Sequence, residues 1–301
     1  MSYDKGSDSA GVEEKSGQLV MGDVLPSYSN EHNGEHLFVS LSELIMENVF
    51  YHPSLESVRE ELDTIEASSI DAILGESSVT EHFVATLVTV IQQSIQSNHK
   101  AIRIMLNSAD SYAMKALLGG KVEASEINPL MGLRGVSRFA SETHAQAFAL
   151  ECSVIKSLRE LGYNVEIVVP FVRALSDAAK IIDKLAEHGL PRGLNGLKVL
   201  YSCDVPSSVL LSERLLQYFD GLAINVDNLA QFTLGVDRLN ESLEHLYDPQ
   251  NESVLSLLDA AISAANHAKK PVILLCASLK DYPLLETHLL DKGTLEVVVT
   301  A

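Results

Sequence analysis

The segment GLAINVDNLAQFTLGVDR, residues 221–238, contains a strand, a polar corner and a helix in direct succession. Its first six residues are a mostly apolar run of the length typical of a buried strand. Asp227 and Asn228 follow at the carboxyl end of this run, and the apolar residues after them are spaced as on a helix. Parallel α/β proteins repeat this unit, and barrels of this class bind ligands at the carboxyl ends of their strands. The segment therefore predicts a parallel α/β fold with Asp227 and Asn228 at a candidate site.

Six more apolar runs of strand length follow the same plan, with amphipathic helices between them. The runs lie at 36–41, 101–106, 165–172, 197–203, 271–276 and 295–300, and the helices at 79–97, 141–161, 175–188, 207–218 and 253–268. A weaker eighth strand is expected within GLRGVSR, residues 132–138. Such strands indicate a parallel sheet covered by helices, and eight units favour a (β/α)8 TIM barrel over a doubly wound sheet. Because the last run ends beside Ala301, the helix that usually closes a barrel is expected to be missing.

Residues 1–33 differ from the rest of the chain in composition. They are rich in Ser, Gly, Asp, Glu and Asn and show no sustained hydrophobic periodicity. Such a stretch buries too little apolar surface to order itself. We therefore expect a flexible acidic leader over 1–33 and a barrel domain over 34–301.

The charge of the chain limits its partners. Acidic residues outnumber basic ones by 41 to 22, which gives a formal net charge of −19. This charge repels nucleic acid and anionic membrane surfaces, and no apolar run reaches the roughly 18 residues of a membrane span. The three cysteines are widely spaced, which argues against a disulfide framework. We expect a cytoplasmic protein that binds neither nucleic acid nor membrane, and whose anionic ligands would need a local cluster of arginines.

Several longer motifs carry a family resemblance. They are INPLMGLRGVSRF (127–139), AFALECSVIKSLRE (147–160), VVPFVR (168–173), GLNGLKVLYSCDVPSSVLLSE (193–213), FDGLAINVDNLAQFTLGVDR (219–238) and LYDPQNESV (246–254). From Leu37 to Ala301 the chain resembles the C-terminal phosphoenolpyruvate/pyruvate-binding barrel of phosphoenolpyruvate synthase, which is related to pyruvate phosphate dikinase. The resemblance implies a metal ion held by a Glu and an Asp, three arginines that grip phosphate, and a cysteine that exchanges a proton with the substrate methyl carbon.

Four residues match functional positions of that family. Cys276 stands at the acid/base cysteine, and a thiol suits proton exchange near neutral pH once its pKa is tuned. Arg134 is in register with one phosphate-binding arginine. Asp227 stands at the substrate-binding asparagine of the family motif Ser-Asn-Asp-Leu-Thr-Gln, and Gln231 matches its glutamine. Structural alternatives remain, since Cys276 is also typical of a small apolar residue at a strand end, and Asp227–Asn228 of a helix N-cap and turn pair.

Other positions depart from the family pattern. Asp204 replaces the metal-binding glutamate and is one methylene shorter, and Asn228 replaces the metal-binding aspartate without contributing charge. Leu41 and Met105 stand at two of the arginine positions, and Arg103, two residues before Met105, is a candidate replacement. Magnesium is therefore expected to bind only weakly at Asp204 and Asn228. The loss of two arginines should cost about 3–6 kcal/mol of phosphate affinity.

Two functions from different classes fit these residues. The favoured one is a stand-alone, degraded relative of the synthase barrel that acts as a non-catalytic binding or regulatory protein for pyruvate, phosphoenolpyruvate or an oxalate-like anion. It would work as a homodimer or in complex with a full-length synthase.

The alternative is an enzyme of pyruvate-enolate chemistry, either the phosphotransfer half-reaction or a carbon–carbon lyase, that uses Cys276, Arg134 and a reworked metal site. Whether the chain is an enzyme stays open at this point. Synthesis of phosphoenolpyruvate from ATP and pyruvate is not expected from it alone, because the residues before His36 hold no nucleotide-binding or phosphohistidine domain.

Overall fold

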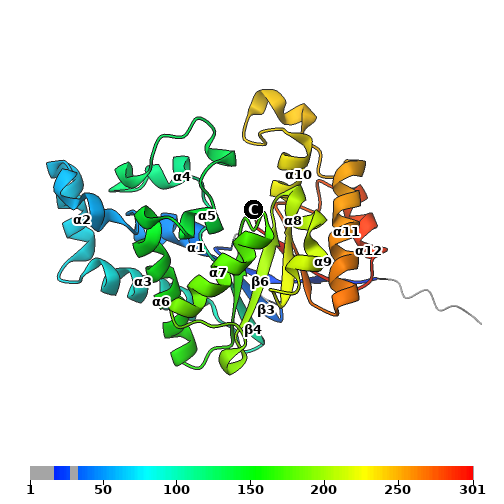
Figure 1. The fold of residues 1–301 in the computed structure, drawn as a ribbon, viewed down its shortest axis with the longest axis horizontal. Coiled ribbons are helices and arrows are strands. Elements are labelled where there is room, and N and C mark those ends of the chain that lie inside the picture. The colour runs from blue at the N-terminus through cyan, green and yellow to red at the C-terminus, as the bar shows by residue number, and fades with distance from the viewer. Residues whose placement is uncertain (1–16, 28–32, 301) are drawn as a thin grey trace, which may run out of the picture.

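Nine parallel strands form one sheet in the computed structural model, which describes residues 17–27 and 33–300 (Figure 1). The strands are β1 (Leu19–Met21), β2 (Asp23–Leu25), β3 (His36–Ser40), β4 (Ala101–Met105), β5 (Val165–Val169), β6 (Lys198–Cys203), β7 (Gly221–Asn225), β8 (Val272–Cys276) and β9 (Leu295–Val299). Their order across the sheet is β1-β9-β8-β7-β6-β5-β4-β3-β2. The seven predicted strands are all present, and the predicted α/β barrel is confirmed.

The sheet closes on itself through its first two strands. Only Gly22 separates β1 from β2, yet β1 pairs with β9 and β2 pairs with β3. The two act as one barrel strand that changes partner at Gly22, whose N–H donates to the carbonyl of Val297 at 2.8 Å. A Cβ atom at Gly22 would lie 2.9 Å from Cγ2 of Val298, so a larger residue would disturb the closure.

The structure corrects two predictions, one about the segment before β3 and one about the segment between β4 and β5. Residues 19–25 belong to the barrel, so the predicted flexible leader is wrong over this stretch, while residues 1–16 and 28–32 lie outside the described part of the chain. The eighth strand predicted at 132–138 is also wrong, since Val136–Phe139 form the short helix α5. The missing strand position is filled by β1 and β2. Strands of three residues carry too few apolar residues to stand out from polar neighbours in sequence.

Helices surround the sheet (Figure 1). They are α1 (Leu41–Leu44), α2 (Thr64–Leu74), α3 (Val79–Ser94), α4 (Ser111–Lys115), α5 (Val136–Phe139), α6 (Ala145–Glu160), α7 (Leu175–Glu187), α8 (Pro206–Leu210), α9 (Ser212–Leu215), α10 (Val226–Leu234), α11 (Glu252–Ala268) and α12 (Pro283–Leu290). The five predicted helices are present, and the one expected at 207–218 is divided into α8 and α9 at Leu211. After β9 only Thr300 is described, so the missing closing helix stays a prediction. Across the described ranges, no helix is both long enough and apolar enough to cross a bilayer.

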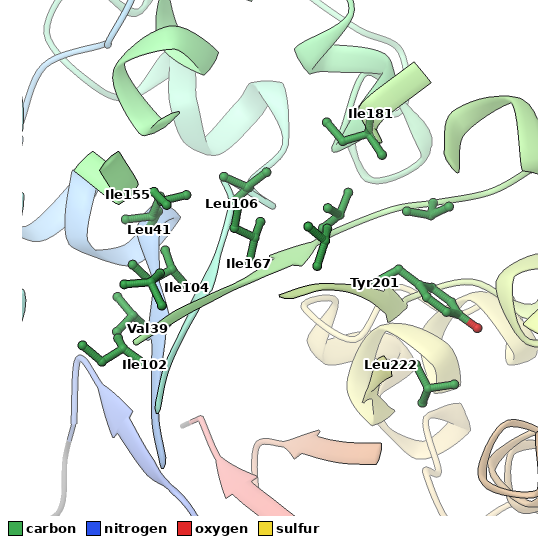
Figure 2. Close-up of a cluster of buried hydrophobic side chains, with 14 of the residues drawn as sticks. Val39, Leu41, Ile102, Ile104, Leu106, Ile155, Ile167, Ile181, Tyr201 and Leu222 are labelled. Atoms are coloured by element: carbon green, nitrogen blue, oxygen red, sulfur yellow. The ribbon is translucent and has the colours of Figure 1, made fainter. Parts of the chain in front are cut away.

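Each strand contributes side chains to two separate cores because alternate residues point to opposite faces. The larger core lies between the sheet and the helices, and Figure 2 shows part of it, with Val39, Ile104 and Ile167 among the labelled side chains. The smaller core lies inside the barrel and consists of Phe38, Met105, Val168, Leu200, Ala223, Ile273, Leu275 and Val298.

The inside of the barrel is layered along its axis. Toward the amino ends of the strands, Arg103 pairs with Glu166 at 2.9 Å and with Glu296 at 2.5 Å. The apolar inner core follows, and polar side chains take over at the carboxyl ends. This layering leaves the carboxyl end as the open, polar mouth, where barrels of this class place their chemistry.

Candidate ligand site at the barrel mouth

A cavity of about 120 Å³ opens at the carboxyl ends of the strands. Its wall is formed by Val24, Phe38, Ser40, Glu43, Met105, Ser108, Arg134, Asn225, Asp227, Asn228, Arg238, Leu275 and Thr300. Three of the predicted site residues, Arg134, Asp227 and Asn228, are among them. A larger hollow of about 590 Å³ between α6 and α7 lies beside Asn164 and Asn195, which precede β5 and β6 at the opposite end of the barrel.

Asp204 and Asn228, the two predicted metal ligands, are hydrogen-bonded to each other. Nδ2 of Asn228 donates to Oδ1 of Asp204 at 2.8 Å, and the backbone N–H of Phe171 donates to Oδ2 at 2.9 Å. Asp204 is fully buried. Asn228 is held in place by the start of α10, where Oδ1 of Asn225 accepts its backbone N–H at 3.0 Å. The helix cap is therefore Asn225, not the pair Asp227–Asn228.

These contacts do not fit a resident magnesium ion. Magnesium takes oxygen ligands at about 2.0–2.1 Å in a nearly ideal octahedron. The group of Asn228 that faces Asp204 is its NH2, because a carboxylate only accepts hydrogen bonds, and an N–H donor cannot be a ligand. To hold an ion between these two side chains, Asp204 would have to lose the donor from Asn228, and Asn228 would have to turn its amide over.

Asp227 ties three segments together around the mouth. Its Oδ2 accepts the backbone N–H of Ala277 at 2.7 Å, and its Oδ1 accepts the hydroxyl of Tyr247 at 3.1 Å. Nη1 of Arg238 lies 3.8 Å from Oδ1. Burial, with the negative charge of Asp227, raises the pKa of Tyr247, which keeps this hydroxyl a donor. Both oxygens of Asp227 thus have protein partners.

Arg134 is a buried cation with unused donors. Its Nε and Nη2 donate to the carbonyl of Ser108 at 3.1 and 2.8 Å, and its Nη1 donates to the carbonyl of Leu130 at 3.2 Å. The guanidinium lies 4.0 Å from the centre of the Phe171 ring. Burial lowers the pKa of Arg134 to about 10, so the group stays charged at neutral pH. A guanidinium has five N–H groups, so one N–H on each terminal nitrogen remains for a ligand.

Arg103 does not reach the mouth. It lies in the charged layer at the other end of the barrel, where its guanidinium is bound to Glu166 and Glu296. The inner apolar core, which includes Met105 on the same strand, separates it from the cavity. Arg103 is therefore not placed to replace the arginines that the family resemblance implies at the mouth.

Cys276 and Gln231 also lie away from the cavity wall. The side chain of Cys276 packs in the core between sheet and helices, while its neighbour Leu275 points into the barrel. Burial, followed by the charge of Asp227, raises the pKa of Cys276 to about 12. Gln231 accepts the backbone N–H of Arg238 at 3.1 Å and so holds the chain after α10. Neither residue lines the cavity.

Two charged residues of the cavity wall were not among the predicted site residues. Arg238 ends the segment 221–238 and contributes a second cation to the wall. Glu43 contributes a carboxylate from α1, directly after β3. Glu43 lies on the helix that follows β3, and Arg238 lies just after the helix that follows β7. Barrels of this class place functional residues after their strand ends, and this placement in the sequence would have indicated both residues.

A second polar cluster lies outside the mouth. Among the described residues, His52, Glu123 and His144 place candidate metal-ligating atoms within 4.8 Å of one another. Arg138 donates to both carboxylate oxygens of Glu123, with Nη1 to Oε2 at 3.0 Å. Nδ1 of His52 accepts the backbone N–H of Ser54 at 3.0 Å, so in the neutral ring the proton is on Nε2, which faces Glu123. Burial lowers the pKa of His52, which favours this neutral ring. Arg138 already supplies the cation, and the residues do not fit a metal ion.

Comparison with known proteins agrees with the fold. Residues 35–301 match the family described as PEP-utilising enzyme, PEP-binding domain. The chain is 42% identical over 197 residues to phosphoenolpyruvate synthase of Pseudomonas aeruginosa, a match that covers 64% of this chain and 25% of that protein. It is 34% identical over 257 residues to phosphoenolpyruvate synthase of Neisseria meningitidis, covering 83% of this chain and 32% of that protein. The chain thus spans a quarter to a third of these relatives.

Solved structures show a more distant likeness. An HpcH/HpaI aldolase/citrate lyase family protein from Burkholderia cenocepacia is 11% identical, with a TM-score of 0.44 over 94% of this chain and 88% of that one. Function does not follow from a likeness of this kind. The match over residues 35–301 covers most of the chain, and the protein therefore belongs to the PEP-utilising enzymes through their PEP-binding domain.

Proposed function

We propose that this barrel binds a small carboxylate at its mouth without a resident magnesium ion, and that it serves as a binding or regulatory protein and not as a catalyst. The observation that carries the proposal is the 2.8 Å hydrogen bond between Asn228 and Asp204, which joins the two positions where the family resemblance implies metal ligands.

The cost of disrupting this bond supports metal-independent binding. A hydrogen bond to a charged group contributes about 1.5–3 kcal/mol, and Asp204 accepts two, from Asn228 and from the N–H of Phe171. A magnesium ion between the two side chains would have to break the bond from Asn228, and Asn228 offers no charge in return. We expect magnesium to bind weakly at most.

The wall of the cavity supports a small anion as ligand. Arg134 keeps two N–H groups for a carboxylate, and charge-assisted pairs of this kind are among the stronger contacts in proteins. A cavity of about 120 Å³ suits molecules of the size of pyruvate or oxalate. Leu41 is buried and Met105 lines the wall where the family resemblance implies arginines. Phosphoenolpyruvate should therefore bind about a hundred- to ten-thousand-fold more weakly than with those arginines present.

The position of Cys276 supports a non-catalytic role. An acid or base that exchanges a carbon-bound proton must reach the substrate and have a pKa near the working pH. Cys276 points away from the cavity, and its pKa of about 12 leaves it protonated at neutral pH. Both observations weigh against enolate chemistry with Cys276 as its acid or base.

The proposed partners come from the resemblance. A homodimer, or a complex with a full-length synthase, would bury more than about 1,000 Å². The final strand gives no open edge for this contact, because β9 pairs with β8 on one side and with β1 on the other. Light scattering of the protein alone and with a synthase tests both forms, and a monomer in each case would contradict them.

Calorimetry tests the ligand proposal. Oxalate and pyruvate should bind with the same affinity in EDTA and in millimolar magnesium, and the variant Arg134→Met should abolish binding. Arg214→Met, an exposed arginine on α9, is the matched control and should bind normally. Binding of oxalate that requires magnesium would overturn metal independence. Absence of all carboxylate binding would overturn the function itself.

A further inference from the structure

The wall of the mouth cavity carries charges of both signs. Arg134 and Arg238 contribute guanidinium groups, and Glu43 contributes a carboxylate. Glu43 is half-buried and lies close to the side chain of Ser40, and the charged group that acts on it most is another carboxylate, Glu47. Within the described residues, Glu43 has no ion-pair partner of opposite charge. A carboxylate in this position is available to a cationic group of a ligand.

The other carboxylates of the mouth are already occupied. Both oxygens of Asp204 accept N–H groups of the protein, and both oxygens of Asp227 accept donors from Ala277 and Tyr247. Burial, with the charge of Glu47, raises the pKa of Glu43, and a cation bound beside this carboxyl would favour its ionised form. Glu43 is thus the wall carboxylate that a ligand can still satisfy.

The size and floor of the cavity restrict the ligand further. A volume of about 120 Å³ is the share of about four water molecules in the liquid, which suits a compact molecule of about six non-hydrogen atoms. Phe38, Met105 and Leu275 form an apolar part of the wall and belong to the inner core. A short apolar or hydroxylated side chain would fit against them.

From this wall we infer that the cavity accepts a small α-amino acid, with its carboxylate at Arg134 and its ammonium group at Glu43. The inference rests on the proposed function, because it assumes that Arg134 anchors a carboxylate. It adds a second contact to the carboxylate at Arg134: the ammonium group of the ligand, which stands in place of the keto group of pyruvate, binds Glu43. Anions without a cationic group leave Glu43 unpaired, and phosphoenolpyruvate would also bring additional negative charge toward it.

L-Alanine and pyruvate form a matched pair of probes, since they have the same carbon skeleton and size. Calorimetry in EDTA should show that the native protein binds L-alanine at least about tenfold more tightly than pyruvate, the factor given by about 1.4 kcal/mol. Glu43→Gln keeps the shape of the side chain and removes its charge. This variant should lose the preference, and Glu213→Gln, an exposed glutamate on α9 outside the cavity wall, should keep it.

Each outcome has a separate meaning. Equal or tighter binding of pyruvate by the native protein, in an Arg134-dependent manner, would overturn the amino-acid inference and leave the proposed function standing. A Glu43→Gln variant with the preference unchanged would overturn the role of Glu43. If neither compound binds to the native protein, both the proposed function and the inference are overturned. The native comparison decides the question even if the variant fails to fold.

Discussion

Placing a second carboxylate opposite a lengthened first one should convert the mouth into a magnesium site. The change is Asp204→Glu with Asn228→Asp, which replaces the hydrogen bond between Asn228 and Asp204 by two facing anions. Asp227 is left unchanged because it holds Ala277 and Tyr247 in place. The single change Asn228→Asp serves as a second variant in case the longer glutamate overpacks the buried site.

The expected effect without metal is destabilisation. Two carboxylates about 4 Å apart repel by about 4 kcal/mol at an effective dielectric constant of about 20. This repulsion either lowers the free energy of unfolding or raises the pKa of one carboxyl by about three units. Magnesium removes the repulsion, so the double variant should be stabilised by the ion while the native protein should not.

Thermal unfolding with and without magnesium measures this difference. At a magnesium concentration of about 100 times Kd, binding adds about 2.7 kcal/mol, which corresponds to roughly 5 °C in Tm for a barrel of this size. Asn195→Asp, an exposed site at the other end of the barrel, adds the same charge and should show no such rise. An equal rise for the native protein would refute the reasoning, because Asp204 and Asn228 would then already hold the ion. A double variant that ignores magnesium would show that the hydrogen bond is not what blocks the site.

Three further predictions concern buried groups. Arg138→Met should lower the free energy of unfolding by about 3–5 kcal/mol in urea titrations, because it leaves the carboxylate of Glu123 buried without its cation. The exposed control Arg59→Met should lower it by less than about 1 kcal/mol. Equal losses for the two variants would contradict the buried-pair argument. Burial raises the pKa of Glu151 to about 7 from the ordinary 4.5, so its contribution to stability is complete below pH 4.5 and is lost as the pH rises through 7. Glu151→Gln should therefore match the native protein near pH 4.5 and be more stable by about 3 kcal/mol at pH 8, and a variant less stable at pH 8 would rule this out. Iodoacetamide at pH 8 should leave Cys276 unmodified in the folded protein, because this residue is 1% exposed and its thiol has a pKa of about 12. After unfolding, all three cysteines should be labelled. Fast alkylation of Cys276 in the folded protein would instead place its thiol at the mouth.

Much of the fold follows from local pattern. The runs at 101–106 and 165–172 are apolar over the length of a strand because each is buried on both faces, and that composition is visible without any partner. β1 and β2 have no such pattern. They are strands because Leu19 pairs with Leu295, across most of the chain, and because Asp23 pairs with Leu37. Neither pairing leaves a local pattern in residues 19–25.

The chemistry of the mouth divides in the same way. The amino-acid sequence alone determined that a carboxylate and an amide follow β7, that Asp204 follows β6, and that Leu41 and Met105 stand where the family resemblance implies arginines. Residue identity decides how much charge a site can have. Those facts were enough to predict a weakened magnesium and phosphate site.

Only the tertiary structure decided how these side chains are used. It joins Asn228 to Asp204, turns Cys276 outward while Leu275 points inward, and separates Arg103 from the mouth by the inner core. Alternation along a strand puts neighbours on opposite faces, but which face becomes the barrel interior depends on closure of the whole sheet. Hydrogen-bond partners such as the N–H of Phe171 come from other strands' loops, so their choice is made by packing and not by any one segment.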